Sequence, residues 1–127
     1  NAQLIKEGRV EVSHCSVSRL PFPDNMFDLV ATFESHYFWP DLINDMKEIL
    51  RVLKPGGNFL VIGEVYKGGN YENKHPGFID MASSEINMAL PGIEDLNAIL
   101  LKAGFSDINT YEDIGKKMIC SIGKKAF

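Results

Sequence analysis

Residues 33–39, with the sequence FESHYFW, combine an acid, a histidine and several aromatic side chains within one short segment. The segment directly follows an apolar run that is typical of a strand buried on both faces. Ligands of open α/β sheets bind outside the carboxyl ends of such strands. Glu34 could therefore neutralise an amine, His36 could accept a proton, and Tyr37 or Trp39 could stack on a bound molecule.

The same segment also has a purely structural interpretation. Phe38 and Trp39 favour packing against the start of the next helix, because aromatic side chains bury large areas. For His36, packing and proton transfer remain equal alternatives. Tyr66 follows a later apolar run and is expected beside the same site, whereas Asp28, at the start of a strand, is expected to be structural and to bond to backbone.

Apolar runs and amphipathic segments alternate along the chain, and they predict the elements that position these side chains. The pattern predicts an α/β layered sheet in one domain. The loop between the last two strands is too short for a crossover helix, so this pair is expected to be antiparallel. The predicted strands are residues 9–13, 27–33, 58–65, 106–111 and 117–125, and the predicted helices are residues 1–8, 40–53, 78–90 and 91–103, with 14–25 and 66–77 as loops.

The helix at 40–53 has the clearest signals. Pro40 suits a first helical position, and Asp41 and Asp45 place negative charge near the amino end. Apolar residues then recur at helical spacing. The sequence Lys-Pro-Gly-Gly at 54–57 ends the helix, because proline cannot continue its hydrogen-bond ladder and glycine permits the reversal.

Composition restricts the class of protein. The chain has 127 residues, 45% of them hydrophobic and 24% charged, with a net charge of −4, which argues against disorder and against a nucleic-acid partner. No apolar run is long enough to cross a bilayer, so no membrane partner is expected. Cys15 and Cys120 are too few for a disulfide scaffold and lack metal-ligand spacing, so a cytoplasmic protein without a metal is expected.

Three phrases go beyond a generic α/β pattern. They are LPFPDNMFDLV at 20–30, EILRVLKPGGNFLVIGE at 48–64 and GIEDLNAILLKAGFSDI at 92–108. Together, at this separation, they resemble class I S-adenosylmethionine-dependent methyltransferases, in particular the branch that acts on small molecules. The phrase LKPGG alone is weak evidence, since any joint between a helix and a strand can use it.

The resemblance implies a Rossmann-like sheet with the strand order 3-2-1-4-5-7-6 and an antiparallel last pair. Residues 9–13 would then be strand 3, 27–33 strand 4, 58–65 strand 5, and the closing pair strands 6 and 7. Residues 1–127 would be a partial methyltransferase domain, its carboxy-terminal part only. Its amino-terminal strand-helix-strand part, with the glycine-rich loop that holds the cofactor, would be missing.

The resemblance also assigns roles to the candidate residues. The loop after strand 3 contacts the adenine ring in the family, usually with an acid where this chain has Ser16 and therefore a weaker, uncharged acceptor. The segment after strand 4 passes the cofactor's sulfonium and faces the acceptor. The implied cofactor-binding residues are Cys15, Ser16, Val17, Phe33 and Glu34, the catalytic residue is His36, and the substrate residues are Tyr37, Trp39 and Tyr66.

The expected function is methyl transfer from S-adenosylmethionine to a small-molecule acceptor, as part of a longer parent enzyme. The alternative is a non-catalytic binding or interaction module that retains half of the cofactor site. With strands 1 and 2 missing, the strand at 27–33 becomes an open edge, which favours a homodimer over pairing with residues 9–13 of the same chain.

Overall fold

The strands form one open sheet in the order β1-β2-β4-β3. The computed structural model describes residues 1–127. β1 and β2 run parallel, and both other neighbouring pairs are antiparallel, as expected for the closing hairpin. This is the 4-5-7-6 part of the predicted strand order. The strands are β1 (Phe27–Phe33), β2 (Leu53–Gly63), β3 (Ser106–Glu112) and β4 (Ile119–Lys124).

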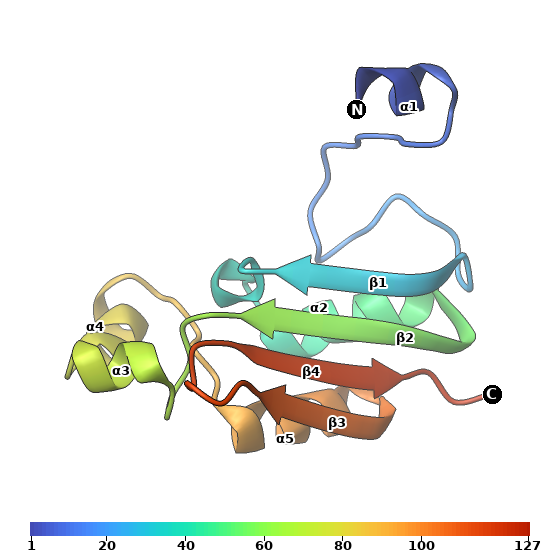
Figure 1. The fold of residues 1–127 in the computed structure, drawn as a ribbon. Helices are drawn as coiled ribbons and strands as arrows, with labels where there is room; N and C mark the ends of the chain where they lie inside the picture. Colours follow the sequence, from blue (N-terminus) through green and yellow to red (C-terminus); the bar gives the residue numbers. More distant parts are fainter.

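The helices lie on one face of this sheet and beyond one of its ends (Figure 1). α2 and α5 cover one face, while α3 and α4 lie past the carboxyl ends of β1 and β2. α1 sits on an arm that extends away from the sheet. No helix is long and apolar enough to span a membrane. The helices are α1 (Ala2–Lys6), the 3₁₀ helix η1 (His36–Phe38), α2 (Leu42–Val52), α3 (Asn70–Lys74), α4 (Phe78–Glu85) and α5 (Ile93–Ala103).

α2 confirms the helix predicted at this position, with a shift at its start. The helix begins at Leu42 rather than at Pro40, because Asp41 is the N-cap and its carboxylate accepts a hydrogen bond from the Asn44 N–H at 3.2 Å. A capping carboxylate of this kind satisfies one of the first free N–H groups and favours the positive end of the helix dipole.

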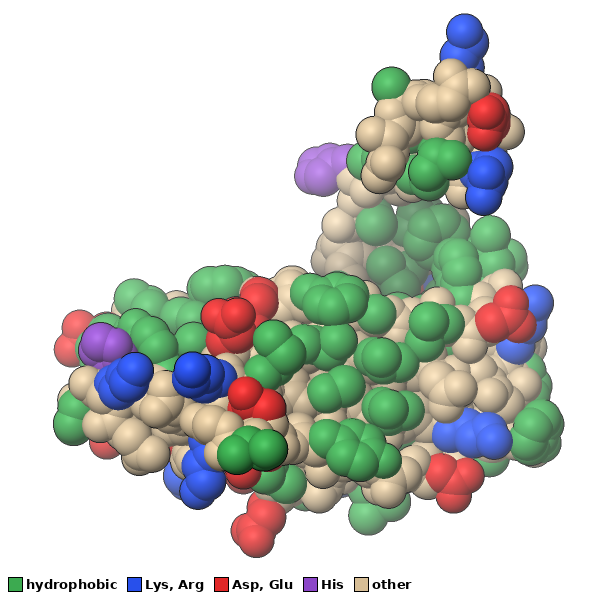
Figure 2. Space-filling view, in the orientation of Figure 1, with side chains coloured by type: hydrophobic (Ala, Val, Ile, Leu, Met, Phe, Trp, Pro, Cys, Tyr) green, Lys and Arg blue, Asp and Glu red, His purple; other side chains and the backbone are tan.

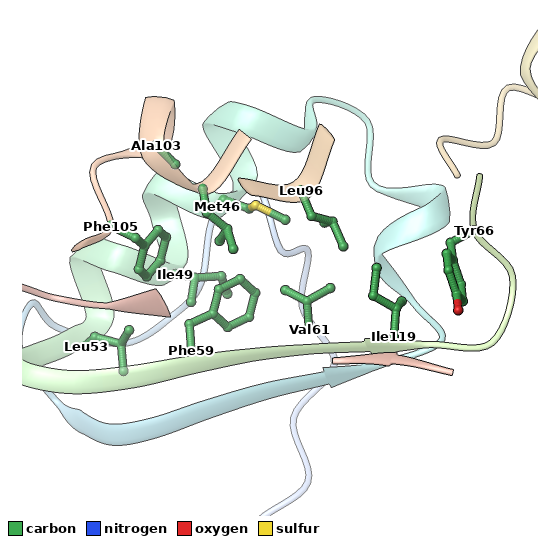
Figure 3. Packing of buried hydrophobic residues seen from close by; sticks show 11 residues of the cluster. Met46, Ile49, Leu53, Phe59, Val61, Tyr66, Leu96, Ala103, Phe105 and Ile119 are labelled. Atoms are coloured by element: carbon green, nitrogen blue, oxygen red, sulfur yellow. The ribbon is translucent and has the colours of Figure 1, made fainter. Parts of the chain in front are cut away.

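The core lies between the sheet and the two covering helices (Figure 3). Met46 of α2 and Leu96 of α5 point down onto Phe59 and Val61 of β2, and all four are 0% exposed. The alternation of buried residues along β2 places every second side chain in this layer. Burying a side chain of this size stabilises the fold by about 1.5–3 kcal/mol, so this layer is the main source of stability.

The other face of the sheet carries no helix, and apolar side chains gather there (Figure 2). The alternation in β1 places Leu29 and Phe33 on this face, 57% and 65% exposed. Phe33 pairs with Ile62 of β2 across the register, and Leu60 of β2 pairs with Ile122 of β4. β1 is also one of the two edge strands of the sheet, β3 being the other. An apolar face and an unpaired strand edge therefore adjoin each other.

Four local predictions were wrong. Residues 9–13 form no strand and lie mostly exposed on the arm, because no neighbouring strand pairs with them. The loop expected at 66–77 contains the short helix α3, and the helix expected at 78–90 ends at Glu85. The carboxylate of Asp28 does not bond to backbone; it lies 3.3 Å from the Lys54 ammonium in an exposed ion pair.

Candidate functional site

The candidate site lies where the parallel strands β1 and β2 end. Their carboxyl ends are in register, since Phe33 pairs with Ile62. The Glu34 N–H then donates to the Ile62 carbonyl at 2.9 Å, which carries the pairing one residue past β1. Glu34 adopts a left-handed backbone with φ of 55°, a conformation that is uncommon for a residue with a side chain. This turn directs the chain into η1, so the predicted segment does sit at the carboxyl edge of the sheet.

The carboxylate of Glu34 joins the two strand ends. Its Oε1 accepts the hydroxyl proton of Tyr37 at 3.1 Å and the backbone N–H of Glu64. The Tyr37 hydroxyl in turn accepts the Val65 N–H at 3.3 Å. Gly63 is required below this arrangement, because a Cβ there would collide with the Tyr37 hydroxyl. Glu34, Tyr37 and the first residues after β2 therefore form one hydrogen-bonded unit, which we call the strand-end clasp.

His36 is enclosed beside the clasp. Its side chain is 1% exposed, and its ring lies 4.3 Å from the ring of Tyr37 between centroids. Burial lowers its pKa from the ordinary 6.5 to about 4, because the charged imidazolium loses hydration. At neutral pH the ring is therefore uncharged, which is the form that can accept a proton. Its Nδ1 is buried without a hydrogen-bond partner.

The three residues predicted to contact an acceptor are largely packed inward. Tyr37 and Tyr66 are 3% and 1% exposed, and burial is the main reason that both phenol pKa values are raised, that of Tyr37 to about 12. The Tyr66 hydroxyl donates to Glu112 of β3 at 2.7 Å. Trp39 stacks on Phe59, with ring centroids 6.4 Å apart. Their contact with an acceptor stays a prediction, and it requires the segment around them to open.

The predicted adenine loop is held by α2. Ser16 Oγ accepts the Ser18 N–H at 3.2 Å, and the Ser18 hydroxyl donates to Asp45 in the first turn of α2 at 2.7 Å. Val17 packs partly buried against the core, while Cys15 is exposed. This places the loop against the helix that follows η1, although no hydrogen bond joins the loop to Glu34 or His36.

Two acidic residues make buried hydrogen bonds that were not identified from the sequence, which indicated for Asp45 only a role at the helix dipole. Asp45 is only 2% exposed, and its carboxylate accepts both the Ser18 hydroxyl and the Asp41 N–H. Its position within the apolar stripe of the helix, three residues after Leu42, was the available signal. Glu112 lies 46 residues from its partner Tyr66, so no local pattern could have linked them.

Comparison with known proteins supports the family resemblance. A family model described as a methyltransferase domain matches residues 1–61. A demethylmenaquinone methyltransferase of Bacillus pumilus is 31% identical over 92% of this chain and 58% of its own length. A sterol 24-C-methyltransferase of Aspergillus fumigatus is 47% identical over 46% of this chain and 15% of its own. These matches support a class I S-adenosylmethionine-dependent methyltransferase as the family that this chain resembles.

The solved structures agree with the class I methyltransferase fold. One from Thermotoga maritima, described as a SAM-dependent methyltransferase, has a TM-score of 0.74 and covers 98% of this chain and 68% of that one. At 20% identity this likeness shows the fold alone. The chain spans little more than half the length of the Bacillus pumilus methyltransferase, so its activity and its acceptor are matters of proposal.

Proposed function

We propose that this chain contributes to methyl transfer from S-adenosylmethionine to the carbon of a small, apolar ring compound. The match to a methyltransferase domain carries the proposal. The acceptor class follows from the names of the relatives, which are methyltransferases of demethylmenaquinone and of sterols. Both acceptors are apolar ring molecules.

Methyl transfer from a sulfonium is an in-line displacement, and it depends on holding two reactants close and aligned. S-adenosylmethionine supplies the activated methyl group when bound. The chain's own contribution would be a fixed surface at the carboxyl ends of β1 and β2, against which the reactants are aligned. The strand-end clasp fixes Glu34 and Tyr37 there, and Phe33 stays exposed beside them. A site of this kind needs no conspicuous acid–base constellation.

The residues after the arm offer a partial fit to the cofactor. The Val17 N–H makes no hydrogen bond within the chain, and the exposed Cys15 and Ser16 directly precede it. A free backbone N–H can hold an adenine ring nitrogen without requiring a particular side chain. Glu34 fits less well, because its carboxylate is already engaged by Tyr37 and Glu64. Adenine binding is therefore proposed at Cys15, Ser16 and Val17.

His36 is the proposed proton acceptor, in its neutral form. Since its ring is enclosed in this conformation, a catalytic role requires residues 33–39 to open when the acceptor binds. Such a role would lower turnover in His36→Asn while leaving cofactor affinity unchanged, because general-base help contributes about 10²–10⁴-fold. An unchanged rate in a folded variant would assign His36 to packing.

The proposed activity is tested with the full reading frame that contains this chain. Incubation with S-adenosylmethionine carrying a labelled methyl group, and with a demethylated quinol or a sterol in turn, should label one acceptor. The matched control replaces Gly63 by Val, which displaces Tyr37 from the strand-end clasp and should abolish transfer. Absence of label on every acceptor, with the cofactor bound, would contradict the proposal.

A second candidate is a non-catalytic binding or interaction module. It is favoured by the inward packing of Tyr37, Tyr66 and His36, which takes three of the predicted site residues out of contact with solvent. Calorimetry of the 127-residue chain with S-adenosylmethionine tests the proposed adenine contacts. We expect weak binding or none, because Val17 offers one free backbone N–H and Ser16 an uncharged acceptor, and micromolar affinity would contradict this reading of the site.

For assembly we propose a homodimer through β1, and for location the cytoplasm. The open edge of β1 and the apolar face beside it support the dimer, since such an edge recruits another strand. The free cysteines Cys15 and Cys120 support a reducing compartment. Light scattering at several concentrations tests the dimer, and a monomer at high concentration would contradict it.

A further inference from the structure

We propose that the groove between α2, α4 and α5 binds the apolar chain of a lipid-like acceptor; this rests on the proposed function and extends it to a second subsite. Two hollows make up the groove. One of about 410 Å³ lies along α5, and one of about 550 Å³ lies next to Phe38 and Trp39. Both sizes fall within the range of small-molecule pockets. Leu42, Ser83, Met88 and Ala89 line both hollows, so the two adjoin along these residues, and together we call them the groove.

The groove begins at the candidate site. Phe38 and Trp39 form one end, and they directly follow the residues of the strand-end clasp. The wall on the opposite side is tied to the same segment, since the Ala89 N–H donates to the Tyr37 carbonyl at 2.9 Å. An acceptor whose ring lies at the carboxyl edge of the sheet could therefore extend a side chain along the groove without leaving the protein surface.

The lining selects an apolar occupant. Most of its residues are apolar, and Phe38 and Ile86 are 64% and 52% exposed, which is unfavourable unless something covers them. The two charged lining residues, Asp95 and Lys102, both belong to the hollow along α5. Asp95 is already engaged, because its carboxylate accepts the Gly92 N–H at 3.0 Å. Ser83, Asn87 and Lys102 are the other polar lining residues; an isoprenoid or sterol side chain needs none of them and would contact the apolar majority.

Trp39 provides a direct readout, because it is the single tryptophan of the chain and lines the groove. Farnesol, a fifteen-carbon isoprenoid alcohol, is the probe, and no cofactor is added. We expect saturable change in the Trp39 emission with farnesol, and none with the five-carbon alcohol prenol at the same concentration. Absence of a saturable response to farnesol would overturn the proposal.

A matched pair of variants on α4 tests the location. Ser83→Glu places a carboxylate in the middle of the groove, while Ser84→Glu places the same charge on the neighbouring residue, which does not line it. Ser83→Glu should weaken farnesol binding about tenfold or more, since the bound chain would cover the carboxylate and remove its hydration without offering a partner. Ser84→Glu should bind as the unchanged chain does. Equal effects of the two substitutions would overturn the proposal.

A second variant guards against a folding defect. Ala98→Phe on α5 fills the hollow with an apolar ring from an exposed position and should also weaken binding, with circular dichroism unchanged. Undiminished binding in this variant would count against the groove. Farnesol binding that persists while no acceptor is methylated would contradict the proposed function and leave the groove standing, so the two failures are distinguishable.

Discussion

The two faces of the sheet carry similar apolar side chains in very different surroundings. On the helix-covered face, Phe59 and Val61 are 0% exposed; on the open face, Leu29 and Phe33 are 57% and 65% exposed. The difference comes from α2 and α5, which cover one face only. Residue type alone therefore does not determine a side chain's contribution. The covered face stabilises the chain, and the open face is available for association.

Phe59→Ala should give the largest effect and sharpen this contrast. The substitution leaves a cavity between β2 and the helices, which costs about 3–5 kcal/mol of unfolding free energy. Phe33→Ala on the open face removes the same atoms but little buried area, so it should cost well under 1 kcal/mol. Urea unfolding of both variants, extrapolated to low protein concentration where the chain is monomeric, measures the difference. Equal losses would mean that the open face is covered in solution.

Much of this arrangement could be predicted from the sequence. The stripe of apolar residues in α2, the stop at Lys54-Pro55-Gly56-Gly57 and the short loop before β4 are local signals, and each predicted its element. The strand order followed from the family resemblance. Pairing with a neighbour is not local, however: residues 9–13 have the alternation of a strand, but no strand lies beside them to complete the hydrogen-bond ladder.

The site was predicted less completely than the fold. Residues 33–39 were placed correctly at the carboxyl edge, because they follow an apolar strand. Their burial could not be read from the sequence: whether His36 or Tyr37 faces solvent depends on α4 and on residues 86–91, which come from a distant part of the chain. The groove depends on the same long-range packing, since its lining residues come from α2, α4, α5 and residues 86–91.

Acid should lower the free energy of unfolding of the chain through His36. The pKa of this histidine is lowered to about 4 in the folded chain, so between pH 6.5 and pH 4 the unfolded chain binds a proton that the folded chain does not. Stability is fully present above pH 6.5 and falls as the pH is lowered. From pH 7 to pH 5 the expected loss is about 2 kcal/mol. Urea unfolding at both values measures it.

His36→Asn is the control for this acid sensitivity. The amide does not titrate, so the variant should lose less stability than the unchanged chain over the same pH interval, whatever its stability at pH 7. If the unfolding free energies of the two proteins change in parallel with pH, the His36 ring is hydrated in solution and is not enclosed.

The strand-end clasp should have a smaller effect, on the order of 1–3 kcal/mol. Glu34→Ala leaves the Glu64 N–H and the Tyr37 hydroxyl without their acceptor, whereas Glu34→Gln keeps an oxygen in place. We therefore expect Glu34→Ala to lose more stability than Glu34→Gln. The rate of amide hydrogen exchange at Glu64 and Val65 should be higher in Glu34→Ala than in Glu34→Gln. Equal behaviour of the two variants would indicate that Glu34 makes no structural contact.

The smallest effect on the stability of one chain, and the most informative about the open face, is expected from Phe33→Lys. Phe33 is 65% exposed and lies on the edge strand, so a lysine there costs the isolated chain no more than about 0.5 kcal/mol. A charge on this face and edge would nevertheless oppose pairing with another strand, as lysine does on natural edge strands. Light scattering should then show a shift toward monomer, while the free energy of unfolding in urea, extrapolated to low protein concentration, stays unchanged.

Leu101→Lys is the matched control, since Leu101 is 68% exposed on α5, and it should leave the association state unaltered. A dimer that persists in Phe33→Lys and dissociates in Leu101→Lys would move the association surface from the open face to the helical one.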